Sequence, residues 1–460
     1  MRPASSGFRP GKGAGMKLMR SVPLLAALAV ALVAPSAAMA ETSSSTLVVD
    51  RDRVQCGNAG FTSIQAAVDA ARPGDQIRVC PDLYPESVTV DIPLTLWGDP
   101  DAVEAVNCFD PTPSQPGDLD PAQQVVVDPP GDDFTTAFAL RANDIVIAGF
   151  VIQGASVGVD ASDTFSGSRI HHDLFRLNTL FAVDSGSEGS QQSRTDHNCI
   201  RQNRYGLVSE LDNDAIWVAT TGAYERAAWN ARDLRNARID HNQTYKNGVG
   251  VEAGGPGRHD EVTFDHNVSR ADAGGIGLLN STGGAILDNE ITLTSNTAIL
   301  IGGDNSDLTI ASNLVTDGGS GIVFAAMAYI DKIPAPSRNV LVAGNTVLRM
   351  KGSGIIAAAG MPTSPGDLHD SVIADNVSSD NAAGVVFRSY NTGNEVRNNV
   401  TERNTRYGIY TDLYTAGNLF DGNRMLDNAL DAGDKSWPAN TWTANQCVTD
   451  DPAGMICGAG

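Results

Sequence analysis

Short apolar runs alternate with asparagine, aspartate and glycine along most of the chain after residue 140. From residue 170 one phrase recurs: an apolar residue, two variable residues, and then Asn or Asp. Its terminal residues are Asp173, Asn198, Asn242, Asn267, Asn289, Asn313, Asn345, Asn376, Asn399 and Asn423, at successive spacings of 25, 44, 25, 22, 24, 32, 31, 23 and 24. A short repeat lengthened by insertions is typical of a solenoid.

Most repeats carry a second Asx residue, and in many a glycine and apolar residues follow it, as in Gly384-Val385-Val386. The second Asx residues are Asn178, Asn203, Asn247, Asp272, Asn381, Asn404 and Asn428. Apolar runs bounded by such residues predict strands between tight turns. A repeat of this length holds three short strands and three turns. A leucine-rich horseshoe is the alternative, but its Leu-x-x-Leu-x-Leu frame is absent.

We therefore predict an all-β fold, a single-stranded right-handed parallel β-helix with an N-terminal capping α-helix. Coils would stack ~4.8 Å apart, so that equivalent asparagines hydrogen-bond along columns. Residues 61–71 predict the capping helix, with Thr62 and Gln65 as a capping box. Residues 41–98 would form the N-terminal cap and first coils, 99–133 a surface loop, 134–434 the coils and 435–460 the C-terminal cap.

Residues 1–40 have the features of a signal peptide. Lys17 and Arg20 precede an apolar stretch, and Ala38-Met39-Ala40 fits a cleavage site before Glu41. The positive region begins at Met16, which suggests that residues 1–15 are an upstream over-extension. We expect a secreted, extracellular protein, since no second apolar stretch is long enough to span a bilayer.

Charge narrows the range of partners. Residues 1–40 hold five Lys/Arg and no Asp/Glu, so cleavage would change the net charge from −22 to −27. Nucleic acid is not an expected partner, because no basic stripe is present. A polyanionic glycan would be repelled unless Ca²⁺ bridged it to the protein, through Asp212-Asn213-Asp214 or Asp304-Asn305-x-Asp307. We expect a monomer whose acidity serves solubility.

Six cysteines in an exported chain indicate disulfides. Cys56 and Cys80 bracket the first structural unit, and Cys447 and Cys457 bracket the last. By elimination, Cys108 and Cys199 form the third pair. All six are interpreted as structural.

Insertions fall at one place in the coil, near 209–236, 252–260, 325–338 and 357–370. Loops added at one register emerge on one face, which in solenoids is often the binding face. Exposed aromatic rings stack on sugars, although a packed loop would bury the same rings. The predicted substrate-binding residues are Trp217, Tyr224, Arg226, Trp229, His259 and His369.

The third insertion supplies a candidate catalytic group, Tyr329, Lys332 and Arg338. Proton abstraction beside a uronate carboxylate needs a cation to hold the carboxylate and a group to return the proton. Arg338 or Lys332 would supply the cation and Tyr329 the proton. The alternative is a proline-containing loop with ordinary solvated charges.

Four histidines share one register in consecutive coils: His172, His197, His241 and His266. Stacking would place them in a column ~14 Å long. They would bind a metal or transfer protons, aided by Asp196, Asp240 and Asp265. The favoured alternative is a ladder of neutral imidazoles beside the asparagine turn. Alternation along a strand predicts that each Asp faces away from the adjacent His.

The N-terminal block resembles the opening of pectin methylesterase-type β-helices. This resemblance rests on Phe61–Ala71, Pro73-Gly74-Asp75, Ile77-Arg78-Val79, Tyr84-Pro85-Glu86 and Leu94-Thr95-Leu96. With its repeats, the chain is similar to secreted bacterial β-helix proteins of the pectin-lyase-like superfamily, including NosD-like repeat proteins. The resemblance implies the fold over most of residues 55–457. The catalytic motifs of pectin methylesterases are absent, and Lys332–Arg338 departs from the Arg-x-Pro-x-x-Arg element of pectate lyases.

Two classes of function follow. One is an extracellular protein that binds, and cleaves or epimerises, a polysaccharide or cell-surface glycan through the loop face. The other is a non-catalytic adhesion scaffold that uses the solenoid as a spacer. Copper handling, implied by the NosD-like resemblance and the histidine column, is a third hypothesis.

Overall fold

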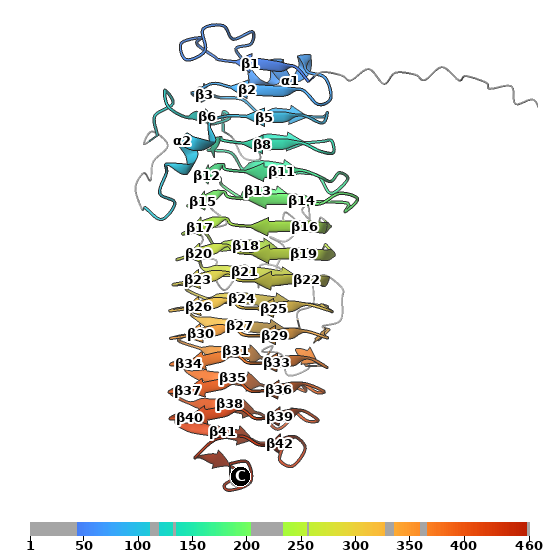
Figure 1. Ribbon diagram of the computed structural model, residues 1–460, viewed down its shortest axis with the longest axis vertical. Helices are drawn as coiled ribbons and strands as arrows, with labels where there is room; N and C mark the ends of the chain where they lie inside the picture. Colours follow the sequence, from blue (N-terminus) through green and yellow to red (C-terminus); the bar gives the residue numbers. More distant parts are fainter. Residues whose placement is uncertain are drawn as a thin grey trace, which may run out of the picture. The chain divides into compact units, whose positions relative to one another are not determined.

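The computed structural model describes residues 44–110, 119–131, 135–203, 233–254, 257–326, 335–358 and 366–457. The predicted signal peptide lies outside these residues. From Ser44 onward the chain forms one compact unit, a right-handed parallel β-helix (Figure 1). Each coil contributes one strand to each of three faces, called here sheets 1, 2 and 3. Neither described helix is long and apolar enough to cross a membrane.

Sheet 1 has fifteen strands within the described residues, all paired in parallel. They are β1 (Thr46–Val49), β2 (Gln76–Val79), β5 (Thr95–Trp97), β8 (Val146–Ala148), β11 (Arg169–His171), β14 (Ser193–Asp196), β16 (Leu234–Asp240), β19 (His259–Asp265), β22 (Ser281–Leu287), β25 (Thr309–Ala311), β29 (Leu341–Ala343), β33 (Val372–Ala374), β36 (Glu395–Arg397), β39 (Leu419–Asp421) and β42 (Thr441–Thr443).

Sheet 2 follows sheet 1 in each coil and has thirteen described strands. They are β3 (Asp82–Tyr84), β6 (Val125–Val127), β9 (Val151–Gln153), β12 (Leu174–Arg176), β15 (Cys199–Arg201), β17 (Gln243–Tyr245), β20 (Val268–Arg270), β23 (Glu290–Thr292), β26 (Leu314–Thr316), β30 (Thr346–Leu348), β34 (Val377–Ser379), β37 (Val400–Glu402) and β40 (Arg424–Leu426).

Sheet 3 closes each coil and is described in two sections of four and nine strands. The first holds β4 (Val88–Val90), β7 (Thr136–Leu140), β10 (Val157–Ala161) and β13 (Phe181–Ser185). The second holds β18 (Val249–Ala253), β21 (Gly274–Leu279), β24 (Thr297–Gly302), β27 (Ser320–Ala325), β31 (Ser353–Ala357), β35 (Ala383–Phe387), β38 (Tyr407–Thr411), β41 (Leu430–Asp434) and β43 (Asp450–Asp451).

The interior is a set of apolar columns, because the parallel register places equivalent residues above one another. In sheet 1, Ile310 pairs with Val342, Val342 with Ile373, and Ile373 with Val396. All four side chains are buried. A single coil cannot bury its apolar side chains alone. They become buried only when neighbouring coils stack on it, so stability depends on the repetition of coils.

The corner between sheets 1 and 2, called corner 1, contains the predicted asparagine column. Asn242 is typical, because its side-chain Nδ2 and its backbone N–H both donate to Oδ1 of Asn267, each at 3.1 Å. The same bonds continue from Asn198 through Asn423 to Asn445, a last member that the sequence reasoning did not include. Every buried corner amide thus has a partner without water.

The residue before each ladder asparagine has a left-handed backbone. His197, His241, His266, Asp288 and Ser312 have φ between 53° and 58°. This conformation turns the chain sharply from sheet 1 into sheet 2. It is uncommon for residues with a Cβ, and the ladder supplies the hydrogen bonds that hold it.

The N-terminal helix α1 (Ile64–Ala70) is confirmed, but the predicted capping box is wrong. Ser63, rather than Thr62, is the N-cap, and its Oγ accepts from the Ala66 N–H. Gln65 instead bonds with Thr89 of β4. The Glu86 carboxylate accepts from the Ile64 and Gln65 N–H groups. A negative charge there favours the helix terminus, so a side chain distant in sequence replaces the local cap.

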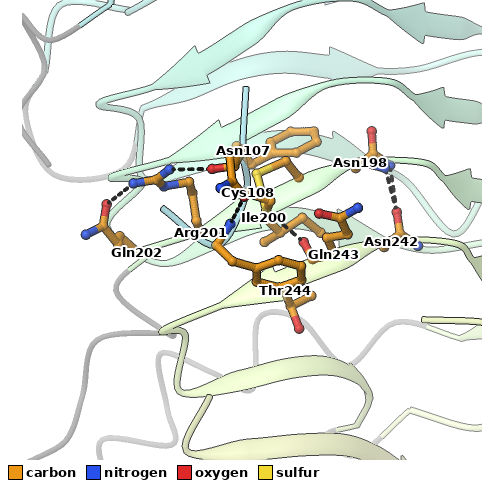
Figure 2. The surroundings of a disulfide bond; sticks show 12 residues. Asn107, Cys108, Asn198, Ile200, Arg201, Gln202, Asn242, Gln243 and Thr244 are labelled. Carbon is orange, nitrogen blue, oxygen red and sulfur yellow. Dashed lines mark hydrogen bonds between the residues drawn. A yellow bond between two sulfur atoms is a disulfide. The ribbon is translucent and has the colours of Figure 1, made fainter. Parts of the chain in front are cut away.

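All three disulfides pair as predicted: Cys56–Cys80, Cys108–Cys199 and Cys447–Cys457. The second joins the 99–133 segment to β15 (Figure 2). Beside it, Arg201 donates to the Asn107 carbonyl oxygen at 3.3 Å. The segment is not only a surface loop, since it contains the short helix α2 (Pro100–Glu104) and strand β6 of sheet 2.

Asp173 occupies the first position of the corner 1 ladder and yields a stability prediction. Its Oδ1 accepts from the Phe150 N–H at 2.8 Å, but its buried Oδ2 has no partner among the described residues. Burial raises the pKa of Asp173 well above its ordinary value. A raised pKa in the folded state gives stability that is present below the unfolded pKa and lost as the pH rises through the folded pKa.

We expect Asp173→Asn to stabilise the protein at pH 7–8 by ~1–2 kcal/mol. The new amide N–H would face the Ile147 carbonyl, as the Asn198 amide donates to Ile170 one coil later. Denaturant midpoints measured from pH 5 to 8 should fall for the wild type and change less for the variant. The reciprocal change Asn242→Asp should destabilise, and a destabilised Asp173→Asn variant would contradict this account.

Candidate functional site

The predicted loop face lies at the corner between sheets 3 and 1, called corner 3. Six of its predicted residues lie outside the described part of the chain: Trp217, Tyr224, Arg226, Trp229, Tyr329 and Lys332. Arg338 and His369 are described, and the structure brings them together. They lie on β28 (Ser337–Arg338) and β32 (Leu368–His369), which pair in parallel with Arg338 opposite His369.

Arg338 and His369 form a small polar group at this corner. The Arg338 Nη1 lies 3.5 Å from His369 Nδ1 and 3.7 Å from the Asp370 carboxylate. Half of the Arg338 side chain is exposed. An exposed guanidinium that is already oriented by a carboxylate can donate to a bound hydroxyl or carboxylate with little loss of side-chain entropy.

Two tyrosines extend this corner into the following coils. Tyr390 and Tyr414 are 46% and 56% exposed, and their ring centroids are 5.1 Å apart. A Cβ on Gly366 would lie 2.4 Å from His369 Nε2 and 2.8 Å from the Tyr390 carbonyl oxygen, so these two groups leave no space for a side chain there. Arg338, His369, Tyr390 and Tyr414 are called here the corner 3 ridge. Sequence reasoning missed both tyrosines, although each follows the apolar strand of its repeat.

His259 does not join the ridge, which corrects its predicted place in substrate binding. The side chain is buried, and its Nε2 lies 3.2 Å from the Gly254 carbonyl oxygen. Burial lowers the pKa of His259. A neutral ring packed against backbone fits a structural role.

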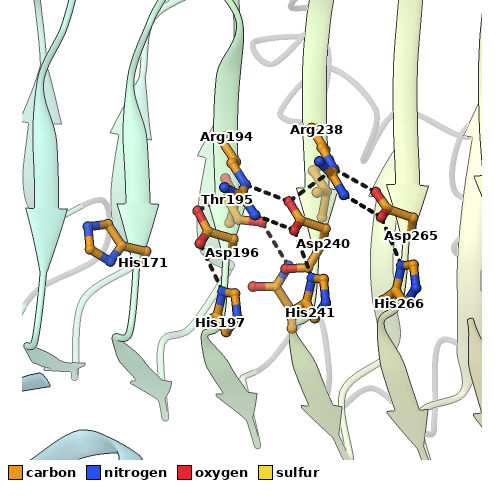
Figure 3. Close-up of polar contacts among 12 residues, drawn as sticks. His171, Arg194, Thr195, Asp196, His197, Arg238, Asp240, His241, Asp265 and His266 are labelled. Atoms are coloured by element: carbon orange, nitrogen blue, oxygen red, sulfur yellow. Dashed lines mark hydrogen bonds and ion pairs between the residues drawn. The ribbon is translucent and has the colours of Figure 1, made fainter. Parts of the chain in front are cut away.

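The histidine column forms as a continuous stack. The centroids of His172 and His197 are 5.0 Å apart, and the next two steps, to His241 and His266, are 4.9 Å each. The planes of neighbouring rings differ by no more than 3°. Figure 3 shows the last three rings in line beside corner 1.

The prediction that each Asp faces away from its His is wrong. Nδ1 of His197, His241 and His266 lies 2.8–2.9 Å from the carboxylate of the preceding Asp (Figure 3). Strand alternation ends at the Asp, because the His has the left-handed backbone of the corner. That turn brings the ring back over the carboxylate.

Arginines from the preceding coil complete each unit. Arg194 donates through Nε and Nη2 to the two Asp240 oxygens at 2.8 and 2.6 Å, and Arg238 does the same for Asp265. Burial alone raises the pKa of Asp196, but hydrogen bonds from Arg169 and His197 lower that pKa to about 2. These carboxylates are therefore ionised and act as acceptors for both partners.

The geometry of the column limits what it can bind. A histidine ligand lies ~2.0–2.1 Å from Zn²⁺, so two ligands of one ion cannot be more than ~4.2 Å apart. Parallel rings 4.9 Å apart place equivalent nitrogens beyond that limit. Neighbouring rings in this arrangement therefore do not share an ion, although a single ring whose Nδ1 bonds a carboxylate leaves its Nε2 available.

Two members of the Asp304–Asp307 group proposed for Ca²⁺ have protein partners, and Asp307 accepts from the Asn339 side-chain amide at 3.2 Å. Asn305 accepts from the Ser281 N–H at 2.9 Å and donates to the Gly302 and Gly303 carbonyls. Asp212–Asp214 lies outside the described residues. Asp50, Asp52 and Asp82 bring carboxylate oxygens within 4.8 Å of one another, a cluster that the sequence reasoning did not identify. Asp50 uses its oxygens for the Arg53 and Cys56 N–H groups.

Two known families match the chain in sequence. Residues 166–333 match the family described as periplasmic copper-binding protein (NosD), and residues 335–425 match the right handed beta helix region. The first segment contains the histidine column and the second contains all four residues of the ridge. No curated protein matches the chain.

Several solved structures are similar in backbone. The A-module of the mannuronan C-5 epimerase AlgE6 of Azotobacter vinelandii is 14% identical, with 84% of this chain and 94% of that chain covered and a TM-score of 0.48. The Dettilon tailspike protein is 13% identical, with 76% and 60% covered and a TM-score of 0.43. The DFA-IIIase of Arthrobacter chlorophenolicus is 13% identical, with 83% and 93% covered and a TM-score of 0.43.

The Asp–His–Arg units predict a loss of acid stability. A lowered pKa gives stability that is present above the unfolded value and lost as the pH falls through the folded value, here between about 4 and 2. Asp196→Asn should lower the free energy of unfolding at pH 7 by ~2 kcal/mol, and the difference should vanish near pH 2.

The matched control is Asp317→Asn, which removes an exposed carboxylate paired with Arg349 at 2.6 Å. Exposed ion pairs contribute little to stability, so the free energy of unfolding of this variant should change by less than ~1 kcal/mol. If both substitutions changed the free energy of unfolding equally, the buried Asp–His–Arg unit would stabilise the protein no more than an exposed ion pair does.

Proposed function

We propose that this chain, a right-handed parallel β-helix repeat protein, is exported and binds an extracellular polysaccharide along the corner 3 ridge. The observation that carries the proposal is the alignment of Arg338, His369, Tyr390 and Tyr414 on consecutive coils. Neighbouring coils lie ~4.8 Å apart, so these groups form a row that an extended polymer can follow.

The chemistry of the row suits a sugar polymer. Tyrosine rings offer apolar faces to sugar rings and hydroxyls to their polar edges. Arg338 donates in a fixed direction because Asp370 holds it. Exposed apolar side chains gathered in one place commonly mark binding surfaces, and Leu413, 67% exposed, adjoins Tyr414 in the chain.

Three features support export. All six cysteines are paired in three disulfides, which fits an oxidising compartment. The N-terminal sequence has the predicted signal features. The family that matches residues 166–333 is described as periplasmic.

The strongly negative net charge restricts the class of polysaccharide that can bind. A neutral glycan approaches without repulsion, whereas a polyuronate needs Ca²⁺ to offset the charge. Affinity for polyuronates should therefore rise when Ca²⁺ is added. New ultraviolet absorbance or new reducing ends over pectate, alginate and glycosaminoglycans would separate cleavage from binding alone.

The double substitution Tyr390→Ala/Tyr414→Ala tests the ridge. We expect affinity for the best glycan of a neutral and acidic panel to fall at least tenfold, or ~1.4 kcal/mol, because two stacking faces are lost. Affinity electrophoresis and calorimetry give the measurement. Leu314→Ala removes an exposed apolar residue from sheet 2 and should leave binding unchanged. If both variants bound the glycan with the same affinity, the ridge would not be the binding surface.

A second substitution separates the ridge from a spacer scaffold. Lys332→Ala/Arg338→Ala should weaken glycan binding about fivefold to tenfold by removing charged donors. Arg349→Ala is the control, since Arg349 is equally exposed and ion-paired but lies at another corner. Unchanged binding in the double variant would favour the adhesion scaffold, in which these residues have no contact with the ligand.

A further inference from the structure

The first unit of the histidine column differs from the others. In β14, β16 and β19 an Asp precedes the column histidine, but in β11 the same position holds His171. His172 therefore has no strand carboxylate in its own unit. Its Nε2 instead lies 3.0 Å from the Glu104 carboxylate, which α2 supplies.

Helix α2 is held against this end of the column by two glycines. The Gly98 and Asp99 N–H groups donate to the Ala148 and Gly149 carbonyls, both at 2.8 Å. A Cβ on Gly98 would lie 2.3 Å from the Gly149 oxygen, and one on Gly149 would lie 2.6 Å from the Pro100 nitrogen. Only glycine permits this approach, so the position of Glu104 is built into the fold.

A cavity lies beside these groups. Its volume is about 490 Å³, and Trp97, Glu104, His171 and His172 line it, together with Arg78 and Asp101. Trp97 and His171 occupy the same outward column with Ala148 between them. Ala148 is fully buried, and the two rings lie with their centroids 6.0 Å apart, edge to face.

The contacts fix where the protons lie. If His172 donates its Nε2 proton to Glu104, its Nδ1 must accept, because a neutral ring has one donor and one acceptor. His171 Nδ1 lies 2.7 Å away and is then the donor. His171 Nε2 is left as an acceptor. Burial and the nearby Arg169 lower the pKa of His171 to about 4, so the ring is neutral near pH 7.

The lining also sets the charge of the ligand. The lining contains one arginine, Arg78, and three acidic residues, Asp99, Asp101 and Glu104. An anion would be repelled, whereas hydroxyl groups would find carboxylate and imidazole acceptors. Trp97 is 42% exposed and provides an aromatic face. Pockets of ~300–1,000 Å³ hold small organic ligands, a range that includes a sugar unit.

We propose that the α2 cavity binds one neutral sugar unit, with Trp97 as the stacking surface and His171 Nε2 as a hydroxyl acceptor. Glu104 is a positioning residue, because it acts by holding His172 and through it the tautomer of His171. This site is separate from the corner 3 ridge, since it lies beside corner 1 in the N-terminal coils. The unit is a free monosaccharide or the end of a chain.

Calorimetry on the full mature chain tests the proposal, with the methyl glycosides of glucose, galactose and mannose as probes and glucuronate as the anionic comparison. At least one neutral glycoside should bind saturably, and glucuronate should bind at least tenfold more weakly. Tighter binding of an oligosaccharide with the same terminal sugar identifies a chain end, and equal binding identifies a free sugar.

Substitutions locate the binding. Trp97→Ala should weaken it at least tenfold, Trp97→Phe should retain it within about threefold, and Glu104→Ala should weaken it while Glu104→Gln restores it. His266→Asn, at the far end of the column, and Leu314→Ala, on sheet 2, are controls that should bind normally. Thermal melting confirms that each variant is folded. The proposal is overturned if no neutral glycoside binds, if glucuronate binds best, or if folded Trp97→Ala binds like the wild type.

Discussion

Hydrogen bonding at corner 1 is the constraint on which the structure depends. A coil that turns sharply into the next sheet leaves a backbone N–H inside the corner, where water does not reach, and an unpaired buried amide costs ~1–3 kcal/mol. Asparagine solves this in the coils from Asn198 to Asn423, because its Oδ1 accepts from the preceding coil's backbone and, from Asn242 on, side chain, while its Nδ2 donates to the next coil. The bonds of Asn289, Asn313 and Asn345 are 2.9–3.0 Å long and nearly identical. Regular bonds require regular coils.

The ladder also determines what the surface presents. Its geometry requires a left-handed residue immediately before the asparagine, and that residue points out of the solenoid at the same place in every coil. Where the sequence supplies histidine there, the rings stack; where it supplies Asp288 or Ser312, the stack ends. The column is thus a by-product of the turn. The preceding Asp and the arginine of the neighbouring coil then turn a row of rings into a row of ion-paired units.

The repeat made the architecture predictable, because one spacing governs the ladder, the apolar columns and the insertions together. Features without a repeat were not predictable from the same pattern. The orientation of Asp240 toward His241 depends on a positive φ, which ordinary strand alternation does not anticipate. The cap of α1 depends on Glu86, more than twenty residues away. Tyr390 and Tyr414 become neighbours through stacking, and each alone is an ordinary loop tyrosine in the sequence.

Departures from the repeat are therefore the informative positions in this molecule. Asp272 replaces the second asparagine of its repeat, at the corner between sheets 2 and 3. Burial raises the pKa of Asp272 to about 6, although the Thr244 and Ser269 hydroxyls and the Asn247 amide donate to its carboxylate. Asp173 begins the corner 1 ladder with fewer donors, and beside it His171 takes the place of an aspartate. Selection for the fold alone would retain asparagine and aspartate, since both satisfy the neighbouring coil. In the first unit His171 stands where the later units have an aspartate, and His172 contacts the Glu104 carboxylate of α2 instead. This unit therefore depends on a separate helix, whereas the later units do not. The cavity beside this unit is lined by Trp97, Glu104 and His171, so the departure from the repeat coincides with acceptors and an aromatic face in one place.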